Sequence, residues 1–109
     1  MKLKRLMPSM REKKRYIVFE IENEASNKLV FDSINKALND FLGILGMSKV
    51  NPVIMEDKFN GKKGIIRINH KYKDEVIVAL SLIGEFNIKV IGVSGILKKA
   101  EQNYIQEEE

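Results

Sequence analysis

The chain has 109 residues, 44% of them hydrophobic, with a formal net charge of +4 and no cysteine. This length suits a single domain, the lack of cysteine excludes disulfides and thiolate metal sites, and no apolar run approaches the roughly 20 residues that span a bilayer. The N-terminus lacks the apolar stretch of a signal peptide, so we expect a cytoplasmic protein with no membrane contact.

The N-terminal region is strongly basic and leads into the first predicted strand. Residues 1–15 contain seven Lys or Arg and one Glu, and we interpret residues 1–14 as a basic arm. From Tyr16 to Ile21 apolar side chains alternate with period two, and both faces are apolar through Val18. This pattern predicts a strand in the interior of a sheet.

The middle of the chain predicts a helix followed by two strands. Ser26 is a suitable N-cap, the apolar residues after it recur at three- and four-residue steps, and Gly46 is expected to end the helix. A second strand is predicted over Pro52–Lys58. Asn60-Gly61 then predicts a tight reversal and a projecting basic loop, followed by a third strand over Gly64–Asn69.

The last third predicts a second helix, a fourth strand and a short third helix. Asp74 is expected to cap the second helix and Gly84 to stop it. The fourth strand is predicted over Ile88–Val93 and the third helix from Ile96 to about Tyr104. Residues 105–109 form an acidic tail.

These elements follow the order strand–helix–strand–strand–helix–strand, which is typical of an α+β, ferredoxin-like fold. We therefore expect a single domain over residues 15–104, with a four-stranded antiparallel sheet. Two helices should lie on one face, with an extra C-terminal helix, and the first and third strands should be central. Because this fold hosts many unrelated functions, it does not by itself indicate what the chain does.

The face of the sheet opposite the two main helices is predicted to be apolar. Tyr16, Val18 and Ile65 should point to this face, which lacks the paired aromatic residues that stack RNA bases in an RNA-recognition motif. The third helix could cover part of the patch, and we expect a protein partner or a second copy of this chain to cover the rest. On this interpretation Val18→Glu would leave the fold intact and break an interface.

Clustered positive charge and a pI near 9.3 favour nucleic-acid binding, although a lysine-rich surface can also serve solubility alone. Residues 60–73 contain five basic residues and no acid. The candidate RNA contacts in the arm, the predicted loop and the third strand are Arg11, Lys13, Lys14, Arg15, Lys62, Lys63, Arg67, Lys71 and Lys73.

A turn before the third helix is a further candidate phosphate site. Ser94 could cap the helix, Gly95 permits close backbone approach, and Lys98 and Lys99 follow one turn later. An ordinary turn with solvated lysines explains the same residues equally well. Catalytic chemistry has little support, because His70 is the single histidine and no metal-ligand spacing is present.

Several stretches together resemble the archaeal ribonuclease P protein component 2 family. They are the arm from Leu6 to Tyr16, the strand Tyr16–Ile21, Gly64-Ile65-Ile66-Arg67, and Gly92-Val93-Ser94-Gly95 followed by Lys98-Lys99-Ala100. The resemblance covers nearly the whole chain, and its two ends are the specific parts. Ile96 stands where the family pattern has threonine, so the side chain offers no hydroxyl there, although the backbone donors remain.

The resemblance implies a subunit of ribonuclease P, the ribonucleoprotein that removes the 5′ leader from precursor tRNA. It further implies that the RNA catalyses hydrolysis with Mg²⁺ and that this chain binds no cofactor. The implied partners are the ribonuclease P RNA, precursor tRNA through the assembled enzyme, and a TIM-barrel-like sister subunit, component 3. A ribosomal-type RNA-scaffold protein and a small-molecule-binding regulatory module of the same topology remain as alternatives.

Overall fold

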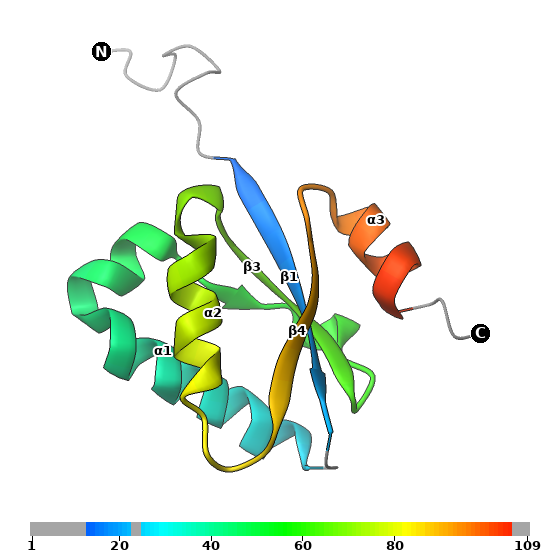
Figure 1. Ribbon diagram of the computed structural model, residues 1–109, viewed down its shortest axis with the longest axis horizontal. Helices are drawn as coiled ribbons and strands as arrows, with labels where there is room; N and C mark the ends of the chain where they lie inside the picture. The colour runs from blue at the N-terminus through cyan, green and yellow to red at the C-terminus, as the bar shows by residue number, and fades with distance from the viewer. Residues whose placement is uncertain (1–12, 23–24, 106–109) are drawn as a thin grey trace.

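The computed structural model describes residues 13–22 and 25–105, which form one antiparallel sheet with helices on both faces (Figure 1). The main elements are β1 (Lys14–Ile21), α1 (Asn27–Val50), β2 (Val53–Ile54), β3 (Lys63–Asn69), α2 (Lys73–Ser81), β4 (Ile88–Ser94) and α3 (Leu97–Ala100). The strand order is β2-β3-β1-β4, so β1 and β3 are central. The ferredoxin-like α+β fold is therefore confirmed.

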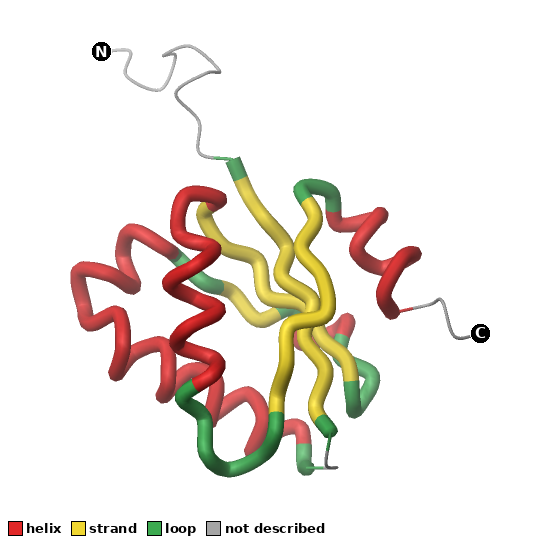
Figure 2. Tube along the Cα trace, in the orientation of Figure 1, coloured by secondary structure: helices red, strands yellow, loops and turns green. Residues whose placement is uncertain are grey.

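The main core lies between the sheet and the pair of helices α1 and α2, on one side of the strands (Figure 2). Ile17, Phe19 and Ile21 alternate along β1 onto this face, and each is at most 1% exposed. The buried residues that meet them from β3, α1 and α2 are Ile66, Ile68, Ile34, Leu38, Val76 and Leu80. The period-two pattern of β1 thus produces the core that the sequence predicts.

The opposite face of the sheet is covered by α3, and this corrects one prediction. Val18 and Ile65 are fully buried in a second cluster with Ala100 of α3. The small side chain of Ala100 lets the helix lie close to the sheet, and the helix continues as a π-helical turn over Glu101–Ile105. The expected open patch of Tyr16, Val18 and Ile65 is therefore wrong, because two of its members are inside the domain and Tyr16 is half-buried.

Helix α1 begins as predicted but extends past Gly46. The Ser26 hydroxyl accepts a hydrogen bond from the Leu29 amide at 3.2 Å, which confirms the N-cap. Gly43 breaks the helix with a φ of 74°, the helix then resumes, and Asn51 ends it in the left-handed conformation. Among the described residues, neither α1 nor any other helix has the length and hydrophobicity needed to cross a bilayer.

Other boundaries differ because 3-10 turns flank the elements. A turn over Glu56–Lys58 cuts the second strand short. Another, over His70–Tyr72, is capped by the Asn69 side chain and runs directly into α2, so Asp74 lies in the first turn of α2 and does not cap it. α2 ends at Ser81, before Gly84. The arm and the acidic tail lie outside the described residues, apart from 13, 14 and 105, and β1 already begins at Lys14.

An ion pair fastens the C-terminal helical segment to the rest of the domain. The Lys58 ammonium contacts the Glu101 carboxylate, and both side chains are partly shielded from solvent. The hydrogen bond and the charge of Glu101 raise the pKa of Lys58 above its ordinary value of 10.5. The pair joins the 3-10 turn after β2 to the end of α3. It thereby helps to hold α3 over Val18 and Ile65.

This pair predicts a pH-dependent effect of Glu101→Gln. Because the folded state raises the pKa of Lys58, the stabilisation is complete below 10.5 and is lost as pH rises through the raised value. We expect Glu101→Gln to lower the free energy of unfolding by a small amount that is constant from about pH 7 to about pH 9. Urea denaturation should then show the two proteins converging at more alkaline pH. A difference that persists there would contradict this role of the pair.

Candidate nucleic-acid interface

Most of the predicted RNA-binding side chains lie at one end of the sheet. Lys14 of β1 pairs with Asn69 of β3, and Tyr16 pairs with Ser94 of β4, so β1 begins where β3 and β4 finish. This end is at the top of Figure 1, where α2 and α3 also begin. We call it the basic end, and its residues are Lys13, Lys14, Arg15, Lys49, Arg67, Lys71, Lys73, Ser94, Gly95, Lys98 and Lys99.

Asn69 holds three elements together at the basic end. It is 4% exposed, and its amide nitrogen donates to the Lys49 carbonyl at 3.4 Å while its oxygen accepts from the Lys71 amide at 3.2 Å. The end of α1 is thereby fixed beside the end of β3, which brings Lys49 into the site. Neither residue is among the RNA contacts predicted from the sequence. The capping role of Asn69 could have been predicted, because asparagine is a preferred cap before a helical turn. Its contact with Lys49 could not, because the two residues are 20 positions apart.

The turn between β4 and α3 lies against Arg15. The Ser94 hydroxyl accepts from the Ile96 amide at 3.1 Å and contacts the Ile96 carbonyl oxygen at 3.0 Å, so it closes the turn. Ile96, not Ser94, is the residue that precedes α3, and it provides no side-chain cap. An ideal Cβ on Gly95 would lie 3.0 Å from Arg15 Nη1. The structure therefore brings two predicted RNA-binding residues, 80 positions apart in sequence, into contact.

The basic end has few carboxylates to neutralise it. Among the described residues, Asp74 and Glu75 lie in the first turn of α2, which begins at this end. Among the residues that the structure describes, Lys73 is the one cation of the basic end that pairs with a carboxylate, with 3.7 Å between its ammonium and Asp74. The other lysines and arginines of this end are half-buried or exposed. Their charge is therefore available to an anionic ligand.

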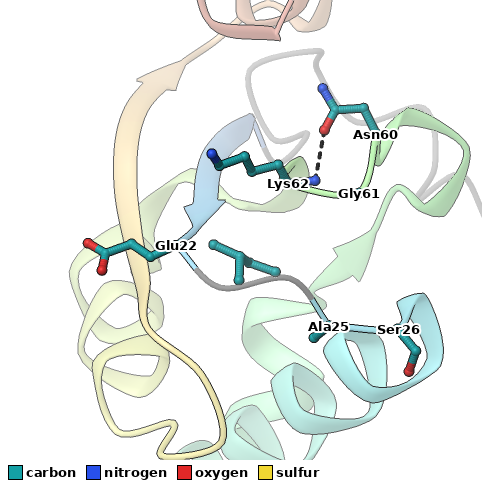
Figure 3. Close-up of a pocket in the computed structure, with 7 residues that line it drawn as sticks. Glu22, Ala25, Ser26, Asn60, Gly61 and Lys62 are labelled. Atoms are coloured by element: carbon teal, nitrogen blue, oxygen red, sulfur yellow. Dashed lines mark hydrogen bonds between the residues drawn. The ribbon is translucent and has the colours of Figure 1, made fainter.

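Lys62 and Lys63 lie at the other end of the sheet, because Lys63 pairs with Glu20 near the end of β1. The length of β1 separates the two ends by about 23 Å. The loop is a closed turn: Asn60 Oδ1 accepts from the Lys62 amide at 2.9 Å, as Figure 3 shows, and from the Lys63 amide at 2.7 Å. A cavity of about 550 Å³ between this turn and the start of α1 is also lined by Glu22. The predicted RNA-binding residues thus form two separate groups.

The helical layer carries exposed apolar side chains, and two of them, Phe41 and Leu45, belong to the apolar face that the sequence predicts for the first helix. Phe41 of α1 and Leu82 after α2 line a hollow of about 360 Å³ and are 43% and 62% exposed. Directly after the break at Gly43, Ile44 and Leu45 are 93% and 68% exposed. We call these four residues the helical patch. Lys36 and Asp40 on its rim pair with each other at 2.9 Å, so the patch has no excess positive charge.

Comparison with known proteins identifies the family. A family model described as the Rpp14/Pop5 family matches residues 15–105. The chain belongs to the Rpp14/Pop5 family. Ribonuclease P protein component 2 of Methanococcus maripaludis is 37% identical, over 94% of this chain and 83% of the relative. The protein of the same name from Pyrococcus horikoshii is 35% identical, over 95% of this chain and 92% of the relative. These relatives confirm the resemblance found in the sequence.

A solved structure supports the fold of this Rpp14/Pop5 chain. A chain in the cryo-EM structure of yeast ribonuclease MRP is similar, with a TM-score of 0.59 over 79% of this chain and 76% of that chain. The two are 19% identical in sequence, so the likeness concerns the fold. As a member of this family, the chain is part of an RNA-containing complex with other protein subunits.

Proposed function

We propose that this chain is a protein subunit of ribonuclease P that binds and supports the catalytic RNA, which removes the 5′ leader from precursor tRNA. The observation that carries the proposal is the basic end, found in a chain whose relatives are ribonuclease P protein components. The RNA would carry out the hydrolysis with Mg²⁺ held by its own phosphates. This chain would supply positive charge and shape, and we expect the assembled enzyme in the cytoplasm.

The proposed contacts are to the RNA backbone. The deep, narrow major groove of an A-form helix is closed to side chains, so a protein recognises such RNA mainly through its phosphates and its shape. Arg15 and Arg67 offer planar guanidinium groups suited to phosphate oxygens, and the lysines add point charges. Arg11, outside the described residues, belongs to the same proposed set. Lys62 and Lys63 would meet a different segment of the RNA, because the other end of the sheet is about 23 Å away.

The salt dependence of RNA binding tests this proposal. If about five phosphates are neutralised by the basic end, the logarithm of the association constant should fall with the logarithm of salt concentration at a slope of roughly −3 to −4.5. Binding of this chain to the ribonuclease P RNA of the same cells, titrated at several salt concentrations, measures the slope. A slope near zero would contradict phosphate binding.

We propose the helical patch as the surface that receives the sister protein subunit, the TIM-barrel-like component 3. Relatives named component 2 belong to an enzyme with at least one further protein component. The large exposed side chains Phe41, Ile44 and Leu82 resemble the aromatic and aliphatic anchors at the centres of protein interfaces. The paired charges on the rim favour a protein over a phosphate-rich RNA.

Two leucines in the patch provide a matched test. Changing Leu45 and Leu82 together to serine should weaken binding to component 3 by about 100-fold, because each removes an exposed anchor without disturbing the core. Leu29→Ser, at an exposed leucine near the start of α1, should bind normally. Co-purification and titration calorimetry measure the difference, and gel filtration of the chain alone detects self-association through the same patch. Normal binding by the double variant would place the interface elsewhere.

A further inference from the structure

Gly95 is not required by the backbone of the turn that contains it. Its φ lies outside the left-handed region that favours glycine, so an alanine could adopt the same conformation. The space beside it, however, is occupied: an ideal Cβ would lie 3.0 Å from Nη1 and 3.8 Å from Cζ of Arg15. Among the described residues, the guanidinium group of Arg15 is therefore what leaves no room for a side chain at position 95.

The turn is the fixed partner in this contact and Arg15 is the movable one. Hydrogen bonds between Ser94 and Ile96 close the turn, whereas the guanidinium group ends a long, flexible side chain. The anchor that Arg15 makes on its own strand is a weak one, from Nη1 to the Lys14 carbonyl at 3.4 Å. A methyl group at position 95 would consequently move the guanidinium and leave the turn in place.

We propose that Gly95 is a positioning residue for Arg15. The absence of a side chain leaves the space in which the guanidinium lies against the turn, and this placement presents Arg15 to a backbone phosphate of the bound RNA. Moving the guanidinium out of this space would cost affinity, because the contact of a planar guanidinium with a phosphate depends on where the group lies. The inference rests on the proposed RNA-binding function, and it gives Gly95 a role through Arg15, where the sequence analysis expected a direct approach of RNA to the glycine.

The test compares Gly95→Ala with Gly84→Ala in binding to the ribonuclease P RNA of the same cells. Gly84 also has no left-handed φ, and a Cβ there would meet nothing within 4 Å, so it is a matched control. We expect Gly95→Ala to lower affinity about three- to tenfold, the size of one weakened hydrogen-bonding contact, and Gly84→Ala to leave affinity unchanged. Thermal unfolding should show both variants folded, because only a flexible side chain must give way.

A double-mutant cycle identifies the route of the effect. In an Arg15→Ala background, Gly95→Ala should cause no further loss, and in an Arg15→Lys background it should also be nearly silent, because a lysine lacks the broad head group. Equal losses with and without Arg15 would overturn the inference and assign Gly95 a contact of its own. Wild-type binding with no loss in Gly95→Ala would overturn this inference alone, whereas no binding by the wild-type chain would overturn the proposed function as well.

Discussion

Val18→Glu is expected to unfold this domain. Val18 is fully buried between the sheet and α3, where a carboxylate would have no solvent and no positively charged partner among the cluster residues. A buried unpaired charge costs several kcal/mol, so we expect the free energy of unfolding to fall by about 3 kcal/mol or more. Small domains have only about 5–15 kcal/mol in total. Urea denaturation followed by circular dichroism measures the loss.

Val53→Glu is the matched control, since it places the same charge on a strand valine that is 37% exposed. This variant should lose less than about 1 kcal/mol, as is usual for surface substitutions. If Val18→Glu were as stable as Val53→Glu, α3 would not cover the sheet face in solution. The interpretation from the sequence, in which Tyr16, Val18 and Ile65 form an open apolar patch, would then be correct.

Changing Lys13, Lys14 and Arg15 together to alanine is expected to lower affinity for the ribonuclease P RNA on the order of 100-fold. Three phosphate contacts of about 1 kcal/mol each give this factor, since about 1.4 kcal/mol corresponds to tenfold. The salt slope should become less negative by about 2 to 3. The assembled enzyme should also need more Mg²⁺ for cleavage, because protein cations and Mg²⁺ both screen RNA phosphates.

The control removes three positive charges at other places, none of them a proposed RNA contact: Lys28, Lys36 and Lys89. All three are exposed and none belongs to the basic end. Lys28 and Lys36 form surface pairs with Asp32 and Asp40, which contribute little to stability. This variant has the same net charge as the first, so equal losses of affinity would show that total charge matters and the basic end does not.

The fold could be predicted because its signals are local. The alternation of apolar residues identifies β1, and the turn at Asn60-Gly61 marks the start of β3, which pairs with β1. The Ser26 cap marks the start of α1. The end of α1 was harder to predict from Gly43 and Gly46, because a glycine can interrupt a helix without ending it. The helix ended only where Asn51 took the left-handed conformation.

The candidate site was predicted less completely because its geometry depends on contacts between distant residues. The sequence identified the cations but did not separate Lys62 and Lys63 from the basic end, a division set by the register of β1 and β3. The backbone carbonyl of Lys49 accepts a hydrogen bond from Asn69, a contact between residues 20 positions apart. The burial of Val18 depends on how closely a short helix approaches the sheet, and no pattern within that helix indicates this distance.

The most direct measurement is to purify the tagged chain from its own cells and sequence the RNA that remains bound. We expect one abundant structured RNA, the ribonuclease P RNA, together with activity that removes the 5′ leader from precursor tRNA. The triple variant of Lys13, Lys14 and Arg15 should recover much less of both at the same protein yield. Recovery of ribosomal RNA, or of no RNA, by the wild-type chain would contradict the proposed function.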